Sequence, residues 1–385
     1  MNYKLTALTP LLVGDGHELS PIDYMVWKDQ VNVLDQPRIF KLLSRGPRLE
    51  GYLTQLRKAT KLDFASWGGF AQNFSQRRIP FESAASTPIW NAAPTESLFI
   101  PTFAASYQGA YLPASALKGA LRTGLVFSRW TAATMERVAS SLEGDRVPRR
   151  TAEAAESQAG ASQVKILSAA DSKPVPHSVF KIYLTRVASL DTRQTGKPQV
   201  AWKVAGRGSV PNQRMNDSTP VFAEMAVPGT GFEGECELKR FFESEEVSRA
   251  LGWRSVPTLE AIVEAANECA AAQLRMHFSY AETAGLTVLA QTIRQLQDRL
   301  SEARNLPGTC LVCLGWGSGF VSKAGFLDTS NEAYRKILRA VPAMSKAIRD
   351  GLPFPKTRRV IFAGGQPSYL PGWASVQFQN AREPV

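Results

Sequence analysis

The sequence feature that most constrains the fold is the segment of residues 314–320, in which every second residue is a glycine: Gly315, Gly317 and Gly319. It directly follows an apolar run, residues 309–314, that predicts a buried strand. Glycines can take positive φ and let another backbone approach closely. Successive N–H groups in such a loop can form an anion-binding concavity, and bases can stack on rings such as Trp316 and Phe320. A tight turn whose rings fill a core has the same spacing, so the pattern alone leaves both interpretations open.

Two nucleotide-binding motifs are excluded at this loop. A P-loop needs a lysine directly after a glycine, and Phe320 follows Gly319. The dinucleotide fingerprint needs a glycine at position 320 or 322, where Phe320 and Ser322 stand. The remaining polar groups of the loop, Ser318 and the nearby Lys323, suit contacts with a phosphate backbone.

The charge balance points to a polyanionic partner. Forty-five Lys and Arg against 34 Asp and Glu give a formal net charge of +11, and each phosphate that such a chain neutralises releases counterions. An ordinary basic surface would have the same composition. We expect no membrane association, because there is no apolar run of about 18 residues and no basic amphipathic helix. With no signal region at the start, we expect a cytoplasmic protein.

The four cysteines predict structural thiols and not a metal site. Cys310 and Cys313 have the spacing of a metal half-site, but no second pair accompanies them, and in a strand residues three apart face opposite sides. The three histidines are far apart in sequence. We therefore expect neither a metal nor a cofactor.

Strand and helix patterns alternate along the chain and predict an α+β fold. Strands are expected at residues 4–9, 24–27, 31–34, 97–103, 164–167, 179–185, 221–227, 232–238, 309–314 and 358–362, and helices at 37–62, 115–130, 259–280, 286–303 and 332–349. Residues 135–162 contain few large apolar side chains, so we place a boundary between residues 1–162 and 163–385. Residues 191–220 form a basic insertion too polar for a core of its own, either disordered or ordered on a partner.

The predicted helix at residues 115–130 contains several residues that lower helix stability, and they lie close together. Ser115 is a suitable N-cap. Gly119 and Gly124 each cost roughly 1 kcal/mol relative to Ala. Lys118 lies near the positive end of the helix dipole, with Arg122 one turn on. This arrangement predicts a phosphate-binding corner, although a solvated basic face would look the same.

Two further segments carry candidate functional groups. The turn Gly14-Asp15-Gly16-His17 displays His17, a possible general base for RNA cleavage, and Asp15, which could position a metal or an attacking hydroxyl. Turn chemistry explains the same residues. Near the end of the chain, Lys356, Arg358 and Arg359 lie at the start of a predicted strand and suit contacts with a nucleic-acid backbone.

Taken together, these segments resemble the RAMP superfamily of CRISPR proteins, and within it most closely the family of fifth subunits of the Csm (type III-A) effector complex. The matching segments, in chain order, are Leu8-Thr9-Pro10-Leu11-Leu12-Val13-Gly14-Asp15-Gly16, Ile22-Asp23-Tyr24, Leu112-Pro113-Ala114-Ser115-Ala116-Leu117-Lys118-Gly119-Ala120-Leu121-Arg122, Asp171-Ser172-Lys173, Glu224 with Pro228-Gly229-Thr230 and Phe232, residues 314–320, and Pro355-Lys356-Thr357-Arg358-Arg359. One departure is Ala114, where the family often has glycine.

The resemblance implies two tandem ferredoxin-like (RRM-like) domains with insertions. It implies a non-catalytic subunit that caps the end of an antiviral ribonucleoprotein at the 3′ region of the guide, needed for assembly and for 3′ maturation of the CRISPR RNA. The implied partners are the CRISPR RNA, target RNA, the Csm backbone subunits and recruited host ribonucleases. The residues expected to bind RNA are Gly14, Gly16, His17, Ser115, Lys118, Arg122, Gly315, Trp316, Gly317, Ser318, Gly319, Phe320, Lys323, Lys356, Arg358 and Arg359.

Two alternatives stay open at the level of sequence. One is a metal-independent RAMP endoribonuclease that cuts repeat RNA, with His17 as base and Asp15 beside it. The other is the equivalent end subunit of a Cmr (type III-B) complex.

Overall fold

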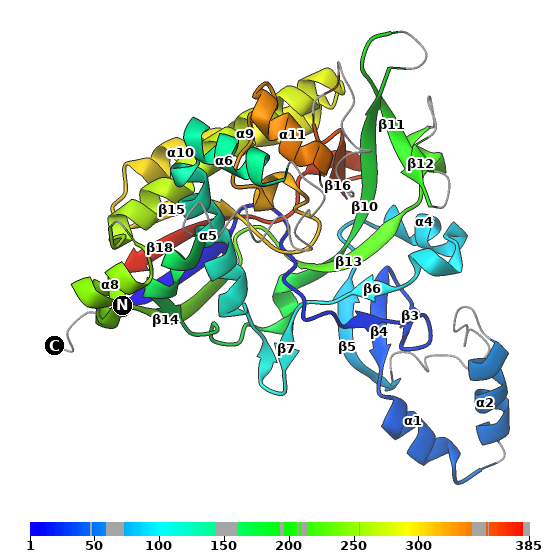
Figure 1. Cartoon of the computed structure of the whole chain (residues 1–385). Helices are drawn as coiled ribbons and strands as arrows, with labels where there is room; N and C mark the ends of the chain where they lie inside the picture. The colour runs from blue at the N-terminus through cyan, green and yellow to red at the C-terminus, as the bar shows by residue number, and fades with distance from the viewer. Residues whose placement is uncertain are drawn as a thin grey trace.

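The chain combines helices and sheets in one α+β body, as the alternating patterns predict (Figure 1). The computed structural model describes residues 1–46, 48–58, 73–142, 161–192, 196–205, 208–209, 214–253, 255–340, 352 and 354–379. Within these ranges, no helix combines the length and the apolar character that crossing a bilayer requires.

The first sheet has five antiparallel strands in the order β15-β18-β1-β14-β9. Their bounds are β1 Asn2–Ala7, β9 Leu167–Ala169, β14 Gly231–Leu238, β15 Thr309–Cys313 and β18 Trp373–Gln379. Buried and exposed side chains alternate along β1 and β14, because only one face of the sheet is covered there. On the covered face Gly234 lies opposite Tyr3, whose ring fills the space that a Cβ on Gly234 would need.

Three helices pack together over the covered face of this sheet (Figure 1). They are α5 (Ala114–Arg129), α9 (Leu259–Thr283) and α10 (Thr287–Arg304). Helices α5 and α9 cross so closely that a Cβ on Gly124 would lie 2.8 Å from the Cα of Ala266. The buried side chain of Asn267 on α9 donates to the Thr309 carbonyl at 3.0 Å and accepts from the Leu311 N–H at 3.0 Å. These two bonds tie the helix layer to β15.

The second sheet is built on the long central strand β10, Phe180–Asp191. Along its length β10 pairs with strands from widely separated parts of the chain: β13 (Val221–Ala226), β16 (Thr357–Ala363) and β11 (Gln199–Val204), with β17 (Gln366–Tyr369) and β12 (Gly208–Ser209) outside them. Most of β10 is buried. Ala226 exchanges backbone hydrogen bonds with Leu11, and this contact joins the second sheet to the segment that follows β1.

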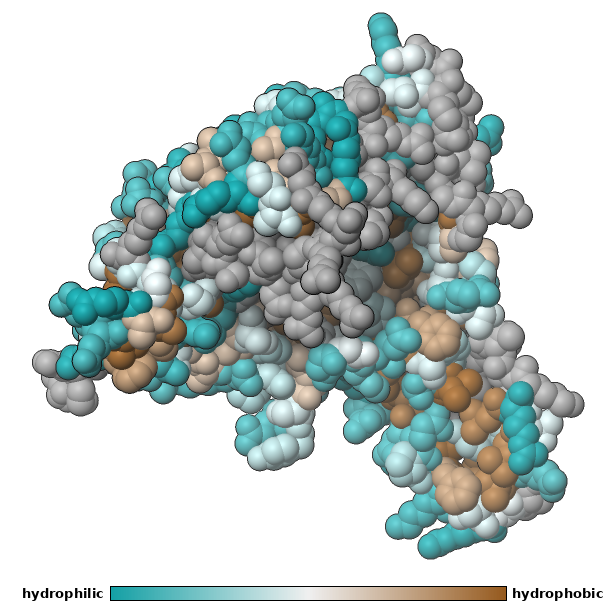
Figure 2. Space-filling model, in the orientation of Figure 1, coloured by the Kyte–Doolittle hydropathy of each residue, from teal (hydrophilic) through white to brown (hydrophobic). Residues whose placement is uncertain are grey.

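A small lobe projects from this body at the lower right of Figure 1. It consists of the sheet β3-β4-β5 (Tyr24–Val26, Gln30–Leu34, Ser75–Pro80) and the helices α1 (Gln36–Leu43) and α2 (Arg48–Lys58). The hairpin turn at Lys28 and Asp29 has φ values of 50° and 55°, which suit a tight two-residue connection. A separate cluster of Met25, Leu34, Ile39, Leu43 and Tyr52 holds the lobe together, and apolar surface gathers over it in Figure 2.

The other regular elements are short. They are β2 (Glu18–Leu19), β6 (Ile100–Pro101), β7 (Ala105–Ser106), β8 (Gly109–Ala110), α4 (Ser86–Ala92), α6 (Ala132–Ser141), α8 (Glu245–Ala250) and α11 (Glu332–Ala340), with 3-10 turns at Thr95–Ser97, Ala161–Ile166, His177–Val179, Met215–Asp217, Arg240–Glu243 and Val321–Lys323.

Four local predictions were wrong. The helix expected at residues 37–62 is interrupted, because the chain turns at residues 44–46 between α1 and α2. Residues 164–166 lie in a 3-10 turn, and only Leu167 of that expected strand is extended. Of residues 97–103, only Ile100 and Pro101 form a strand. The basic insertion is also partly ordered within the chain, because its residues 199–204 pair with the end of β10. Trp202 is buried there, with its ring centre 5.7 Å from that of Phe362. The insertion needs no core of its own, because the edge of β10 provides hydrogen-bond partners for residues 199–204. The last part of the predicted helix 332–349 lies outside the described residues.

The four cysteines are buried and free, as predicted. Burial raises the pKa of Cys269 and of Cys310 to about 12 in each case. The described part of the chain contains no cluster of three His, Cys, Asp or Glu side chains able to hold a metal. The boundary between residues 1–162 and 163–385 stays a prediction; in the first sheet, β1 from the start of the chain lies between β14 and β18 from its second half.

The two glycines of α5 give a matched test of this packing. We expect Gly124→Ala to lower the free energy of unfolding by about 1–3 kcal/mol, because the new methyl group would meet the backbone of α9. Urea denaturation followed by circular dichroism measures this change.

The control is Gly119→Ala, since nothing lies within 4 Å of a Cβ there. This variant should be more stable than the wild type by up to about 1 kcal/mol. Equal behaviour of the two variants would contradict the close crossing of α5 and α9.

Candidate nucleic-acid interface

The glycine-rich loop leaves β15 and is held by backbone contacts on two sides. Gly315, Gly317 and Gly319 have φ values of 85°, 78° and 79°, so the alternating glycines all adopt the left-handed conformation. The Trp316 N–H donates to the Leu12 carbonyl at 2.7 Å, and the Leu314 N–H donates to the Gly372 carbonyl at 2.9 Å. A Cβ on Gly315 would overlap the Leu12 carbonyl oxygen. Only glycine allows the loop to come this close.

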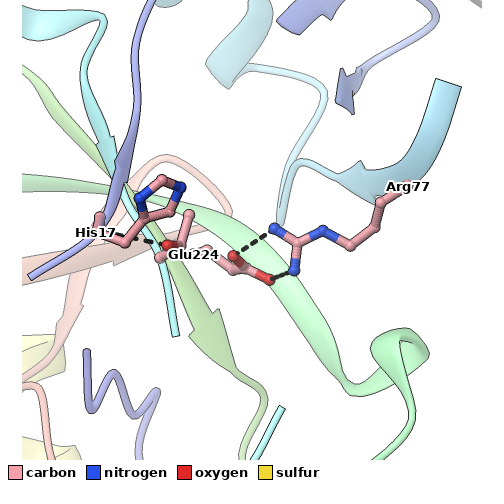
Figure 3. Close-up of polar contacts among 4 residues, drawn as sticks. His17, Arg77 and Glu224 are labelled. Atoms are coloured by element: carbon pink, nitrogen blue, oxygen red, sulfur yellow. Dashed lines mark hydrogen bonds and ion pairs between the residues drawn. The ribbon is translucent and has the colours of Figure 1, made fainter. Parts of the chain in front are cut away.

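The segment after β1 forms the neighbouring wall. Its backbone is fixed by bonds from the Ala104 N–H to the Val13 carbonyl at 2.9 Å and from the Thr102 N–H to the His17 carbonyl at 3.2 Å. The Asp15 carboxylate accepts from the His17 N–H at 2.9 Å, within its own turn. Among the described residues, no hydrogen bond or ion pair joins the exposed His17 imidazole to another side chain, including Glu224, which Figure 3 draws beside it. Turn chemistry therefore accounts for Asp15.

Helix α5 forms the third wall, but its N-terminus differs from the prediction. The N-cap is Pro113, and Ser115 is exposed and makes no capping bond. The Asp171 carboxylate accepts from the Ala114 N–H at 2.7 Å, and the Ser172 hydroxyl accepts from the Leu112 N–H at 2.9 Å. The chain's own carboxylate thus occupies the place where we expected a phosphate, because Asp171 approaches from a segment remote in sequence.

These three walls line an open cavity of about 730 Å³, which we call the main cavity because the predicted segments meet there. The predicted residues that line it are Gly14, Gly16, His17, Arg122, Gly315, Trp316, Ser318 and Lys323. The structure therefore brings together groups from three distant parts of the sequence. Lys118 is half-buried on the same helix as Arg122 and is not among the lining residues.

Sequence reasoning missed several lining residues of the main cavity, above all the small-residue face of α5. Ala116, Gly119, Ala120 and Thr123 follow the spacing of one helix face and line the cavity. Gly124 is explained by packing against α9, whereas no side chain or backbone packs against the position of a Cβ on Gly119. The unexplained helix cost at Gly119 was the signal that this residue faces a site.

A second cavity of about 360 Å³ also adjoins the glycine-rich loop. Gly317, Ser318, Gly319, Phe320, Lys323, Arg358 and Arg359 line it, and Ser318 and Lys323 line both cavities. Its described lining contains no acidic side chain, and Glu18 is the acidic residue among those that line the main cavity. The potential around the loop is therefore set mainly by cations.

The late basic segment divides between the interior and the loop. Arg358 is only 6% exposed and donates to His277 Nδ1 at 2.9 Å, with its guanidinium 4.5 Å from the Tyr280 ring centre. Burial lowers the pKa of Arg358 to about 10. Arg358 is therefore an internal residue rather than a candidate RNA contact, because its donors serve internal partners. The Lys356 side chain is half-buried and lines neither cavity.

The two aromatic rings of the loop are engaged inside the protein. The Arg359 guanidinium lies 4.3 Å from the Trp316 ring centre and donates to the Thr185 hydroxyl at 3.1 Å. Phe320 packs edge-on against Phe354, with ring centres 5.3 Å apart. These rings rigidify the walls of the cavities, and neither presents two free faces to a base.

An ion pair anchors the small lobe to the second sheet (Figure 3). Arg77 on β5 donates to both carboxylate oxygens of Glu224 on β13, at 2.7 and 2.9 Å. The Glu224 side chain is fully buried. Burial raises the pKa of Glu224, and the Arg77 charge and a backbone bond from Phe103 oppose that rise. The charge on the buried Glu224 carboxylate is therefore stabilised by Arg77.

Comparison with known proteins gives a family and a fold. The model of the RAMP superfamily matches residues 4–322, which confirms the predicted resemblance. A chain from the solved structure of a Csm–crRNA–target RNA ternary complex of a type III-A CRISPR-Cas system is 20% identical, with a TM-score of 0.62 over 98% of this chain and 100% of that one. The crystal structure of T. onnurineus Csm5 is 19% identical, with a TM-score of 0.59 over 97% of this chain and 100% of that one. No curated protein sequence matches the chain.

Removal of the Arg77 guanidinium should make stability depend more strongly on pH. In Arg77→Met the buried Glu224 loses its counter-charge, so its pKa rises further above the ordinary value. A carboxyl with a raised folded-state pKa stabilises the fold at low pH, and this contribution is lost as pH rises through the folded-state pKa. We expect a loss of about 3–5 kcal/mol in the free energy of unfolding at pH 8, and a smaller loss at pH 5. Urea denaturation at both pH values measures this difference.

Arg78→Met is the matched control, because Arg78 lies next to Arg77 on β5 and is exposed. It should cost little at either pH. Adding Glu224→Gln to Arg77→Met should remove the extra pH dependence. A loss in Arg77→Met that is equal at pH 5 and pH 8 would show that Glu224 does not need its partner.

Proposed function

The chain belongs to the RAMP superfamily, and on that premise we propose that it is a non-catalytic RNA-binding subunit of a type III-A (Csm) effector complex. In this proposal it caps the end of a cytoplasmic ribonucleoprotein at the 3′ region of the guide RNA, next to the Csm backbone subunits. It supports assembly, and it supports 3′ maturation of the guide by recruited ribonucleases in antiviral defence. The shared fold with a chain of a Csm–crRNA–target RNA complex and with Csm5 supports this membership.

The observation that carries the proposal is the convergence of three distant segments on the main cavity. Residues 14–17, the small-residue face of α5 and the glycine-rich loop all line it, with Arg122 and Lys323 as cations. Glycines and small side chains leave room for a ligand's backbone, while the cations attract phosphates. An extended single strand of RNA has this combination of bulk and charge.

Electrostatics favours this side of the molecule over the open face of the first sheet. On that face β14 exposes Glu233, Glu235 and Glu237 at alternate positions. Lys4 on β1 pairs with Glu233 at 3.3 Å. A row of carboxylates repels a polyanion, so we assign the RNA to the cavities beside the glycine-rich loop.

A binding role also fits the state of the candidate catalytic groups. A general base needs a partner that orients it and a substrate proton within reach. Asp15 serves its own turn, and among the described residues no side chain is bonded to the His17 imidazole. We assign His17 to the wall of the binding site.

Charge removal at the main cavity should weaken binding and reduce its dependence on salt. We expect Arg122→Ala and Lys323→Ala each to lower the slope of log K against log salt by about 0.7, the value for one phosphate contact on a single strand. The loss should be similar for RNAs of different sequence, because phosphate contacts carry no base information. Fluorescence anisotropy with labelled single-stranded RNA over a range of salt concentrations measures both effects.

Arg249→Ala is the matched control, since Arg249 lies on α8 in an exposed pair with Glu245 and its loss changes net charge equally. Arg122→Lys should restore most of the slope. A bulky side chain in Gly119→Leu should hinder binding without loss of charge, because Gly119 lines the main cavity. RNA affinity that is unchanged in Arg122→Ala, Lys323→Ala and Gly119→Leu would refute the assignment of RNA to the main cavity.

The non-catalytic assignment has its own test. Purified protein incubated with labelled repeat RNA, with and without divalent metal, should leave the RNA intact on a denaturing gel. Cleavage that persists after further purification and disappears in His17→Ala would establish an endoribonuclease and overturn the proposal.

A further inference from the structure

The hairpin formed by β7 and β8 ends in an aromatic side chain with almost no contacts. Tyr107 at its tip is 97% exposed, more than any other large apolar side chain in the described ranges. Its hydroxyl accepts a hydrogen bond from the adjacent Gln108 side chain at 3.0 Å. In Figure 1 the hairpin projects from the lower edge of the body. The proposed function does not account for this side chain.

The base of the hairpin is fixed to the wall of the main cavity. Ala104 donates through its N–H to the Val13 carbonyl at 2.9 Å and accepts from the Tyr111 N–H at 3.0 Å. On the other side, the Val175 N–H donates to the Ala110 carbonyl at 2.8 Å. Pro101 and Thr102, which precede the hairpin, line the main cavity. Tyr107 comes three positions after Ala104 along extended chain, so the tip lies within about 10 Å of this fixed base.

We propose that Tyr107 stacks on an unpaired base of an RNA strand that leaves the main cavity; this rests on the proposed function. The rings of the glycine-rich loop already have partners inside the protein, since Trp316 lies against the Arg359 guanidinium and Phe320 packs edge-on against Phe354. The Tyr107 ring, by contrast, is 97% exposed, and the base of its hairpin is fixed to the wall of the main cavity. A neutral ring stacks on any base, so this contact would be tolerant of sequence.

The position of the hairpin favours RNA over a protein partner. The chain enters it from Thr102 and leaves it towards α5, and both lie in the walls of the main cavity. The hairpin is therefore anchored in the walls of the site to which we assign the RNA. A ring this exposed has no role in the core, so its removal tests binding without disturbing the fold.

The test uses single-stranded RNAs that each carry one 2-aminopurine, placed at successive positions, with wild type, Tyr107→Phe, Tyr107→Ser and Gln108→Ala. We expect one or two positions to be quenched on binding wild type, Tyr107→Phe and Gln108→Ala, since all three keep the ring. Tyr107→Ser should lose that quenching and bind about 5-fold or more weakly, the equivalent of one lost stacking contact. Its melting temperature should equal that of the wild type.

The outcomes separate this inference from the function on which it rests. If wild type binds RNA in an Arg122-dependent manner but Tyr107→Ser shows the same affinity and quenching profile, the stacking role is wrong and the proposed function stands. If Tyr107→Ser impairs only the association with the other subunits of the complex, the hairpin is a protein contact and the inference is overturned. If wild type binds no RNA, both proposals are refuted.

Discussion

The geometry of the candidate interface depends on a junction of three backbones at the ends of β1, β15 and β18. Gly315 lies directly against the Leu12 carbonyl, and Gly372 lies directly against that of Leu314; a Cβ at either glycine would overlap the neighbouring oxygen. Both glycines have positive φ, at 85° and 90°. The Gly372 N–H donates to the Pro10 carbonyl at 3.1 Å, which closes the junction. Side chains are excluded from this point, so the loop and the segment after β1 can form adjoining walls of one cavity.

The junction explains which parts of the interface could be predicted from the sequence. Alternating glycines after an apolar strand indicated a loop with positive φ, because few other patterns need glycine at every second position. What the sequence does not display is the partner of each glycine, since β1 and β18 lie at opposite ends of the chain and become neighbours only in the sheet. Their pairing is a long-range contact, which local sequence patterns do not predict. The cavity could not be predicted either, because its walls meet only once these strands have paired.

Residues of the same type also have different roles in the structure, and the local sequence does not predict which residue has which role. Gly119 and Gly124 carry the same helix cost, yet one faces the main cavity and the other meets the backbone of α9. Arg358 and Arg359 are adjacent, but along a strand neighbouring side chains point to opposite faces. Arg358 therefore enters the core beside His277, while Arg359 reaches Trp316. At the start of α5, Ser115 is a better N-cap by type, but Asp171 from a remote segment provides the bond.

Charge is distributed so that a strongly basic chain need not bind RNA over its whole surface. The net charge of +11 coexists with a row of exposed carboxylates on β14 and with buried cations that serve the core. Arg77 neutralises Glu224 and Arg358 serves His277, so neither is available to a phosphate. Among the described residues, the cations that line the main cavity are Arg122 and Lys323. We therefore expect the salt dependence of RNA binding to follow the residues of the candidate interface, so the total charge of the chain would overestimate it.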